Sequence, residues 1–213
     1  MITIKTLIFN AFQENTYVLS DETGKCVIVD AGCESDAEFD KLTKYISSNN
    51  LIPGRLLLTH GHFDHVLGVA KLCAHYQIKV EAHNQDIDLI KRATEYGVVF
   101  GFNVTPVPEI SLFLEEGIAV NFGNSKLAVF HVPGHSKGSV AFYSEVDKFV
   151  ITGDVLFKGS IGRTDLPGGD YDAIMKSIST KLLTLPDDTT VFPGHGPSST
   201  IGIEKKSNPF LIG

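Results

Sequence analysis

Tryptophan is absent from this 213-residue sequence, and cysteine is scarce. Its three cysteines, Cys26, Cys33 and Cys73, are an odd number and form no C-x-x-C pair, which argues against a disulfide framework. We interpret them as reduced thiols of a cytoplasmic protein.

Long apolar runs and a basic net charge are also missing. No run approaches the roughly 20 apolar residues that span a bilayer, and the start of the chain, MITIKTLIFNAFQENTY, soon turns polar, unlike a secretory signal. The formal net charge of −7 disfavours binding to nucleic acid, whose phosphates attract basic surfaces. We therefore expect a cytoplasmic protein with neither a membrane nor a nucleic-acid partner.

Hydrophobic residues make up 43% of the sequence and charged residues 20%, as in globular proteins, and the length suits one domain over 1–213. Alternating or short apolar runs predict strands at 2–9, 15–20, 25–30, 55–60, 78–82, 117–122, 126–132, 139–144, 148–153 and 189–193. Helical spacing predicts helices at 35–48, 66–76, 84–92, 170–183 and 200–207, with an irregular stretch up to 108. This alternation predicts an α/β fold in which two sheets pack together under outer helices.

The stretch LLLTHGHFDHVLG, Leu56 to Gly68, ends a buried strand in a cluster of metal-binding side chains. His60 and His62 alternate along an extended backbone, and a turn would swing Asp64 and His65 to a different side. One loop can therefore address two neighbouring metal ions. Imidazole and carboxylate ligands suit zinc, and they also suit iron or manganese.

Three more segments repeat one pattern, in which an apolar strand is followed by glycine and then by one potential ligand. They are HVPGHSKGS with His135, VITGDVLF with Asp154 and VFPGHGP with His195. Glycine lets the backbone turn sharply before each ligand. The recurrence predicts a metal site assembled from loops at one end of a sheet sandwich.

The order H-x-H-x-D-H, then His, Asp and His resembles the metallo-β-lactamase-fold hydrolase superfamily over essentially the whole chain. The resemblance implies a four-layer αββα sandwich with a binuclear site. By this resemblance, one ion is held by His60, His62 and His135, the other by Asp64, His65 and His195, and Asp154 bridges them. The true β-lactamases carry a cysteine at the position of Asp154, so we do not favour antibiotic hydrolysis.

Within the superfamily, GSIGRTDLPGGD and TIGIEKKSNPF resemble the glyoxalase II-like branch, the hydroxyacylglutathione hydrolases and their relatives. That branch has a C-terminal helical domain that contacts glutathione, whereas only residues 196–213 follow His195 here. Two tyrosines of the family are replaced by Asp165 and Pro197, although the basic residue is retained as Arg163. The resemblance implies that the catalytic residues are kept and that recognition of glutathione differs.

The ligand set itself suggests a mechanism. Two cations about 3.5–4 Å apart lower the pKa of a shared water, which supplies a hydroxide near neutral pH. The hydroxide attacks a carbonyl while a metal stabilises the developing oxyanion. Because a thiolate leaves readily, a thioester suits this site, and we predict a thioesterase with two zinc ions per chain, acting on a small-molecule thioester with Asp64 and Asp154 as catalytic carboxylates.

Two other functions compete with this one. The persulfide dioxygenases share the fold and a similar G-R-T-D motif, and they hold a single iron with the residues that match His60, His135 and Asp154. A non-catalytic metal-binding protein is disfavoured because no ligand position has been lost.

Two residues outside the ligand set carry further predictions. Asp30, in VDAG, is predicted to support a ligand histidine or the backbone of the 60–65 loop. Arg163 is predicted to bind an anionic part of the substrate, and the alternative is an ion pair with Asp165 or Asp170 that braces its loop.

Overall fold

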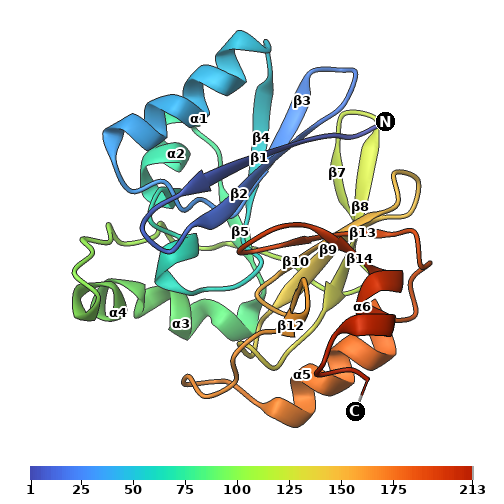
Figure 1. The fold of residues 1–213 in the computed structure, drawn as a ribbon. Coiled ribbons are helices and arrows are strands. Elements are labelled where there is room, and N and C mark those ends of the chain that lie inside the picture. The colour runs from blue at the N-terminus through green and yellow to red at the C-terminus, as the bar shows by residue number, and fades with distance from the viewer. Residues whose placement is uncertain (213) are drawn as a thin grey trace.

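Four layers stack in the order helix, sheet, sheet, helix in the computed structural model, which describes residues 1–212. Figure 1 shows α1 (Asp36–Ser48) and α2 (Val69–Tyr76) outside one sheet, and α5 (Tyr171–Ser177) and α6 (Ile201–Ser207) outside the other. The predicted αββα layering is confirmed.

The first sheet has the strand order β1-β2-β3-β4-β5-β6. Its strands are β1 (Thr3–Phe9), β2 (Glu14–Ser20), β3 (Lys25–Val29), β4 (Ile52–Leu57), β5 (Val80–Ala82) and β6 (Leu112–Phe113). The first three strands are antiparallel, whereas β3, β4, β5 and β6 run parallel to one another. The parallel pairs bring the ends of β3 and β4 to one edge of the sheet.

The second sheet has the order β14-β13-β10-β9-β8-β7. Its strands are β7 (Val120–Phe122), β8 (Ser125–His131), β9 (Val140–Ser144), β10 (Phe149–Gly153), β13 (Thr190–Pro193) and β14 (Ser199–Thr200). Strand β10 pairs with β13 in parallel, so these two strands also end at the same edge. A separate hairpin, β11 (Leu156–Phe157) and β12 (Ser160–Ile161), follows β10.

Three buried clusters fill the spaces between the layers, and the two-residue period of the strands decides which cluster each side chain joins. In β3, Cys26 and Ile28 pack in the cluster that includes α1 and α2, whereas Val27 and Val29 pack between the two sheets. In the outer layer of the second sheet, Ile174 of α5 packs in the third cluster.

The first helix forms because its sequence carries both a start signal and an apolar stripe. Ser35 caps the helix by accepting from the backbone N–H of Glu38, whose side chain reaches back to the cap. Phe39, Leu42 and Ile46 recur at helical spacing and are buried against the first sheet.

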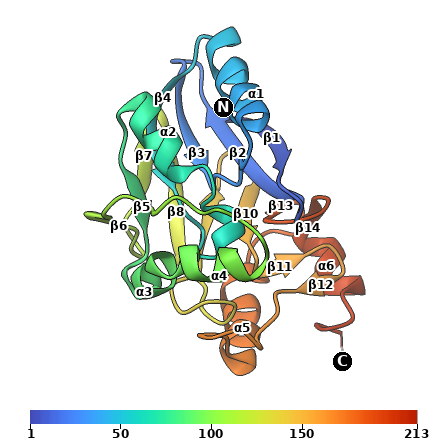
Figure 2. The same ribbon diagram turned by 90° about the vertical axis from the view of Figure 1, so that its left-hand side faces the viewer.

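The stretch after 92, predicted to be irregular, contains a helix. Figure 2 shows α3 (Ile87–Lys91) and α4 (Ala93–Val99) along one end of the sandwich, between α2 and α5. Gly97 and the β-branched Val98 and Val99 are weak helix formers, so local propensity did not reveal α4. Val104 packs so closely on Gly97 that a side chain there would clash, which indicates that tertiary packing holds the helix.

Other expected elements differ mainly in length. The helix predicted at 170–183 is divided into α5 and a π-helical turn, η3 (Ile178–Leu182). Short 3-10 turns, η1 (Phe63–His65) and η2 (Asn84–Asp86), follow β4 and β5.

Across residues 1–212, no helix combines the length and the apolar character needed to cross a bilayer. Cys26, Cys33 and Cys73 all lie in the described part of the chain, and each is buried with a free thiol.

Candidate metal centre

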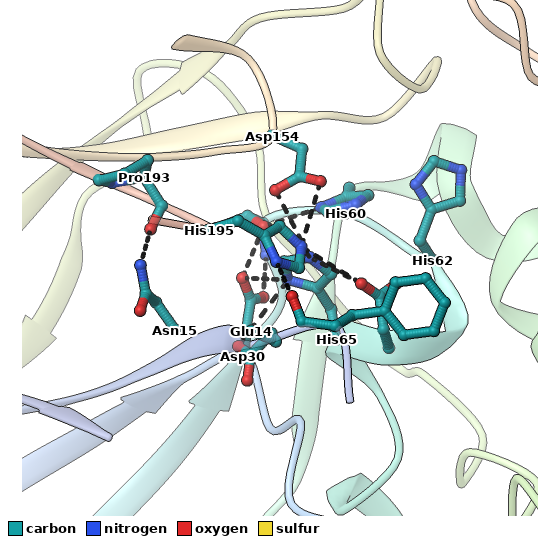
Figure 3. Close-up of polar contacts among 12 residues, drawn as sticks. Glu14, Asn15, Asp30, His60, His62, His65, Asp154, Pro193 and His195 are labelled. Carbon is teal, nitrogen blue, oxygen red and sulfur yellow. Dashed lines mark hydrogen bonds and ion pairs between the residues drawn. The ribbon is translucent and has the colours of Figure 1, made fainter. Parts of the chain in front are cut away.

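The loops after four strands bring the predicted ligand side chains to one end of the sandwich. Strand β4 leads into His60, β10 into Asp154 and β13 into His195, while His135 lies in the turn between β8 and β9. Open sheets commonly bind ligands at the carboxyl ends of their strands. Here two sheets contribute such ends to a single cluster, shown in Figure 3.

His60, His62 and His135 form the first group, with one ring nitrogen of each within 4.8 Å of the others. The outer nitrogens of two rings are occupied, because His60 Nδ1 lies 3.0 Å from Thr59 Oγ1 and His135 Nδ1 lies 2.9 Å from the Arg163 carbonyl. His62 Nδ1 and His135 Nε2 are 2.8 Å apart, and His60 Nε2 has no partner within residues 1–212. Three nitrogens therefore converge.

Asp64, His65 and His195 form the second group, which meets the same 4.8 Å criterion. His65 Nδ1 lies 3.0 Å from Asp30 Oδ2, and His195 Nδ1 lies 2.9 Å from the Phe12 carbonyl. Their Nε2 atoms are 3.2 Å apart, and His195 Nε2 lies 3.2 Å from Asp64 Oδ2. Again the outer nitrogens are held and the inner donor atoms converge.

Asp154 lies between the two groups (Figure 3). Its Oδ1 is 3.5 Å from His65 Nε2, and its Oδ2 is 3.6 Å from the Nε2 atoms of both His135 and His195. Within the described chain, Oδ1 is buried without a hydrogen-bond partner. One carboxylate therefore faces both groups.

These donors fit divalent metal ions. Buried polar atoms normally have hydrogen-bond partners, so two of the four described side-chain atoms that are buried without one, His60 Nε2 and Asp154 Oδ1, point to ligands that bind there. Imidazole and carboxylate donors suit zinc, iron and manganese. The protein fixes ring orientation from outside through Thr59, Asp30 and two backbone carbonyls, as proteins do for metal-bound histidines.

Burial and the charges of the cluster set the protonation of its histidines. Burial lowers the pKa of His62 to about 3, aided by His135, and burial also lowers the pKa of His60 well below its usual range. Both rings are therefore neutral at pH 7, which is the state in which imidazole binds metal. Burial opposes charge at His65 too, but Asp154, Asp64 and Asp30 outweigh it and raise the pKa of His65.

Asp30 is buried beneath the cluster. Its Oδ1 accepts from the Thr59 backbone N–H at 2.8 Å, and its Oδ2 accepts from Thr59 Oγ1 at 2.8 Å as well as facing His65. Because Thr59 Oγ1 also contacts His60, this one carboxylate is connected to both groups of donors. That placement fits the supporting role predicted for Asp30, which stays a prediction.

Arg163 lies at the wall of the cavity beside the cluster, but its side chain is paired. Its Nε and Nη2 donate to the two carboxylate oxygens of Asp165 at 2.8 and 2.7 Å. The hydrogen bonds from Arg163 lower the pKa of Asp165 to about 2. This is the ion pair named as the alternative to substrate binding, and it involves Asp165 rather than Asp170.

Two buried acidic side chains near the cluster were not predicted from the sequence. Asp86 accepts from the Gly61 N–H at 2.9 Å, from Ser136 Oγ at 2.7 Å and from the Gly138 N–H at 2.6 Å. It therefore ties the loop of His60 and His62 to the loop of His135. Glu14 lies fully buried near His65, with Thr16 donating to its Oε2 at 2.7 Å, and burial raises its pKa well above the usual range.

A cavity of about 300 Å³ opens onto the cluster. His62, Asp64, His135, Asp154 and His195 form its floor, so the inner face of both donor groups is accessible to a small molecule.

A model of a protein family described as the metallo-β-lactamase superfamily matches residues 9–195. The chain belongs to this superfamily. Hydroxyacylglutathione hydrolase GloC of Haemophilus influenzae is 38% identical over 98% of this chain and 97% of its own length. Family and relative together support a metal-dependent hydrolase.

Solved structures of the superfamily show the same architecture over nearly all of the chain. The BLEG-1 B3 metallo-β-lactamase has a TM-score of 0.90 at 37% identity and covers 99% of this chain and 100% of its own. A di-iron-bound form of TTHA1623 has a TM-score of 0.89 at 40% identity, covering 97% and 100%. ETHE1 from Myxococcus xanthus has a TM-score of 0.81 at 25% identity, covering 98% and 84%.

Proposed function

We propose that this protein is a metal-dependent thioesterase of the hydroxyacylglutathione hydrolase type, acting on a small-molecule thioester in the cytoplasm. The observation that carries the proposal is the position of Asp154, whose two oxygens face two complete groups of donor atoms at the floor of a cavity. The similarity to GloC supports the choice of a thioester over other hydrolase substrates.

His60, His62 and His135 would hold one metal ion, Asp64, His65 and His195 the other, and Asp154 would contact both. We propose zinc at both positions, and the same donors accept iron or manganese. Bound in this way, the ions supply a water of lowered pKa and polarise the substrate carbonyl.

The side chains at the floor of the cavity would orient the attacking water. Asp64 and Asp154 both line the cavity, so their carboxylates can accept a hydrogen bond from the attacking water and orient it toward the carbonyl carbon. The thiol of the substrate, with an ordinary pKa of about 8.5, departs as a thiolate and needs little help from an acid. Phe12 and Phe63 border the same cavity and make that side of it apolar.

The test is metal analysis of the purified protein followed by a substrate panel. We expect about two metal ions per chain and hydrolysis of thioesters, including S-lactoylglutathione, that is lost on chelation and restored by zinc. A β-lactam belongs in the panel because of the similarity to the B3 enzyme, and we expect it to be a poor substrate. Hydrolysis of the β-lactam without hydrolysis of any thioester would contradict the proposal.

An iron-dependent persulfide dioxygenase is the second candidate, favoured by the similarity to ETHE1. It would use a single iron at His60, His135 and Asp154 in the assignment made from the sequence. One iron per chain together with oxygen consumption on glutathione persulfide would establish this activity in place of the thioesterase.

A further inference from the structure

Four aromatic rings from three segments of the chain meet beside the floor of the cavity. The rings of Phe63 and Phe100 are stacked, with centroids 5.2 Å apart, and Phe12 contacts both of them edge-on at 5.4 and 5.8 Å. Phe102 packs beneath this group, 5.5 Å from Phe12 and 5.3 Å from Phe63. Phe63 belongs to the metal loop itself, so the rings are fixed relative to the donor atoms.

Three of these rings, Phe12, Phe63 and Phe100, form part of the cavity wall, and the rest of that wall is also mainly apolar. Leu89, Tyr96, Leu166 and Pro167 also line it. Phe100 and Phe12 remain 56% and 41% exposed, although large apolar side chains lose free energy in water. A wall of this kind, next to the donor cluster, has the character of a binding surface that a ligand completes.

The charged side chains around the cavity also favour an apolar ligand. Among the described residues that line the cavity, Arg163 is the one cationic side chain apart from the histidines, and Asp165 occupies two of its donor nitrogens. A carboxylate placed against Phe12, Phe63 and Phe100 would lose its hydration without gaining a partner. This wall therefore suits an uncharged apolar group.

We infer that the aromatic wall, Phe12, Phe63 and Phe100, binds the acyl group of the substrate, and that this acyl group is apolar, either aromatic or a chain of several carbons. The inference rests on the proposed thioesterase function and narrows its substrate class. The acyl group is the fitting part because thiol carriers such as glutathione are anionic and would be poorly accommodated against three rings. The carbonyl then lies over Asp154 and the thiol extends toward Arg163.

A series of thioesters that share one neutral thiol, N-acetylcysteamine, tests the inference on the metal-loaded protein. The acyl groups are acetyl, D-lactoyl, butyryl, hexanoyl and phenylacetyl, and kcat/KM is measured for each. A fully buried methylene contributes about fourfold, so even with partial burial we expect hexanoyl to exceed acetyl by about tenfold or more. Phenylacetyl should also exceed D-lactoyl.

Variants at position 100 test whether a preference among acyl groups arises from the aromatic wall. Phe100→Ala should reduce kcat/KM for the hexanoyl and phenylacetyl thioesters by a much larger factor than for the acetyl thioester, and Phe100→Leu should recover part of the loss. Because Phe100 is half exposed, neither change threatens folding. Val99→Ala is the matched control, since Val99, the last residue of α4 and the neighbour of Phe100, is 78% exposed and lies outside the cavity wall.

Calorimetric binding of the product acids adds a measurement that does not depend on turnover. Hexanoate and phenylacetate should bind more tightly than D-lactate to the wild-type protein, and this difference should disappear in Phe100→Ala.

Three outcomes would overturn the inference, and they are distinguishable. Equal kcat/KM across the series would leave the thioesterase proposal standing but remove the acyl pocket. Hydrolysis of no thioester at all would remove the proposed function and the inference with it. A concentration-dependent dimer that Phe100→Ala dissolves would show that a second copy of the chain covers the rings instead.

Discussion

Asp30 Oδ2 lies 3.0 Å from His65 Nδ1, and the same oxygen accepts a hydrogen bond from Thr59 Oγ1, which contacts His60. One carboxylate thus fixes, directly or through one hydroxyl, a histidine of each donor group. Since a carboxylate only accepts hydrogen bonds, His65 carries its proton on Nδ1 and presents Nε2 toward Asp154.

Replacing Asp30 should therefore weaken both metal positions. We expect Asp30→Ala and Asp30→Asn to lose about 10–100-fold in metal affinity or in turnover. An amide has a single accepting oxygen, so it cannot serve the Thr59 backbone N–H at one position and Thr59 Oγ1 with His65 at the other, as the carboxylate does. Competition with a chromophoric chelator measures the affinity. Asp188→Ala, which removes an exposed carboxylate paired with Lys148, is the control and should behave as wild type. Unchanged affinity in both Asp30 variants would show that the contact is dispensable.

Asp154 should matter equally to the two ions. Asp154→Ala removes the carboxylate that faces His65, His135 and His195, so we expect metal content and kcat to fall together. Asp64→Ala touches only the second group, so it should keep the metal of the three-histidine group. Metal analysis after extensive dialysis separates the two results. An Asp154→Ala protein with two ions and full activity would refute the ligand assignment.

Much of the fold was predictable because the strands are short, strongly apolar and bounded by glycine or polar turns. The alternation in KCVIV sends Val27 and Val29 to one side and Cys26 and Ile28 to the other, which is the signature of a sheet buried on both faces. The candidate ligands were visible for a related reason. His60, Asp154 and His195 each follow such a strand, where a polar residue is out of keeping with the apolar run.

What the sequence did not reveal depends on contacts between distant segments. Asp86 lies in an ordinary polar run, HNQDID, and only folding brings it to Gly61 and Gly138. Glu14 stands in QENTY with nothing to mark it as fully buried. Helix α4 was missed since its formation depends on packing around Gly97 rather than on helix propensity.

Asp86 offers a test of how rigidly the two ligand loops must be held. Its carboxylate joins Gly61, between His60 and His62, to Ser136 and Gly138, beside His135. We expect Asp86→Ala to lower metal affinity at the three-histidine group by about tenfold or more while the second group keeps its ion, because loss of outer-shell support has costs of that size. Asp86→Asn should be less impaired, since one oxygen can still accept. Equal loss at both positions would indicate general unfolding of this end of the fold.

Removal of metal should lower thermal stability. Ligands that bind only the folded state stabilise it, by about 2.7 kcal/mol at a hundred times their Kd. For a chain of this length, that corresponds to a rise in Tm of about 5–10 °C per bound ion at such concentrations. Scanning calorimetry of the chelated protein with and without added zinc measures the shift, and Asp64→Ala should show a smaller one. A zinc-independent Tm would mean that the orphan atoms of the cluster do not bind metal.

Substitutions of Arg163 and of Asp165 distinguish a role in substrate binding from a role in bracing the loop. If the guanidinium binds an anionic thiol carrier, Arg163→Ala should raise KM for S-lactoylglutathione by about tenfold at unchanged kcat and spare neutral thioesters, because charge-assisted hydrogen bonds contribute on this scale. Asp165→Ala should then lower the same KM, since it frees Nε and Nη2 for the substrate. If the pair only braces the loop, both variants should lower Tm to a similar degree and affect charged and neutral thioesters alike. We predict the first pattern, because Arg163 lines the cavity and its fork can exchange one carboxylate for another.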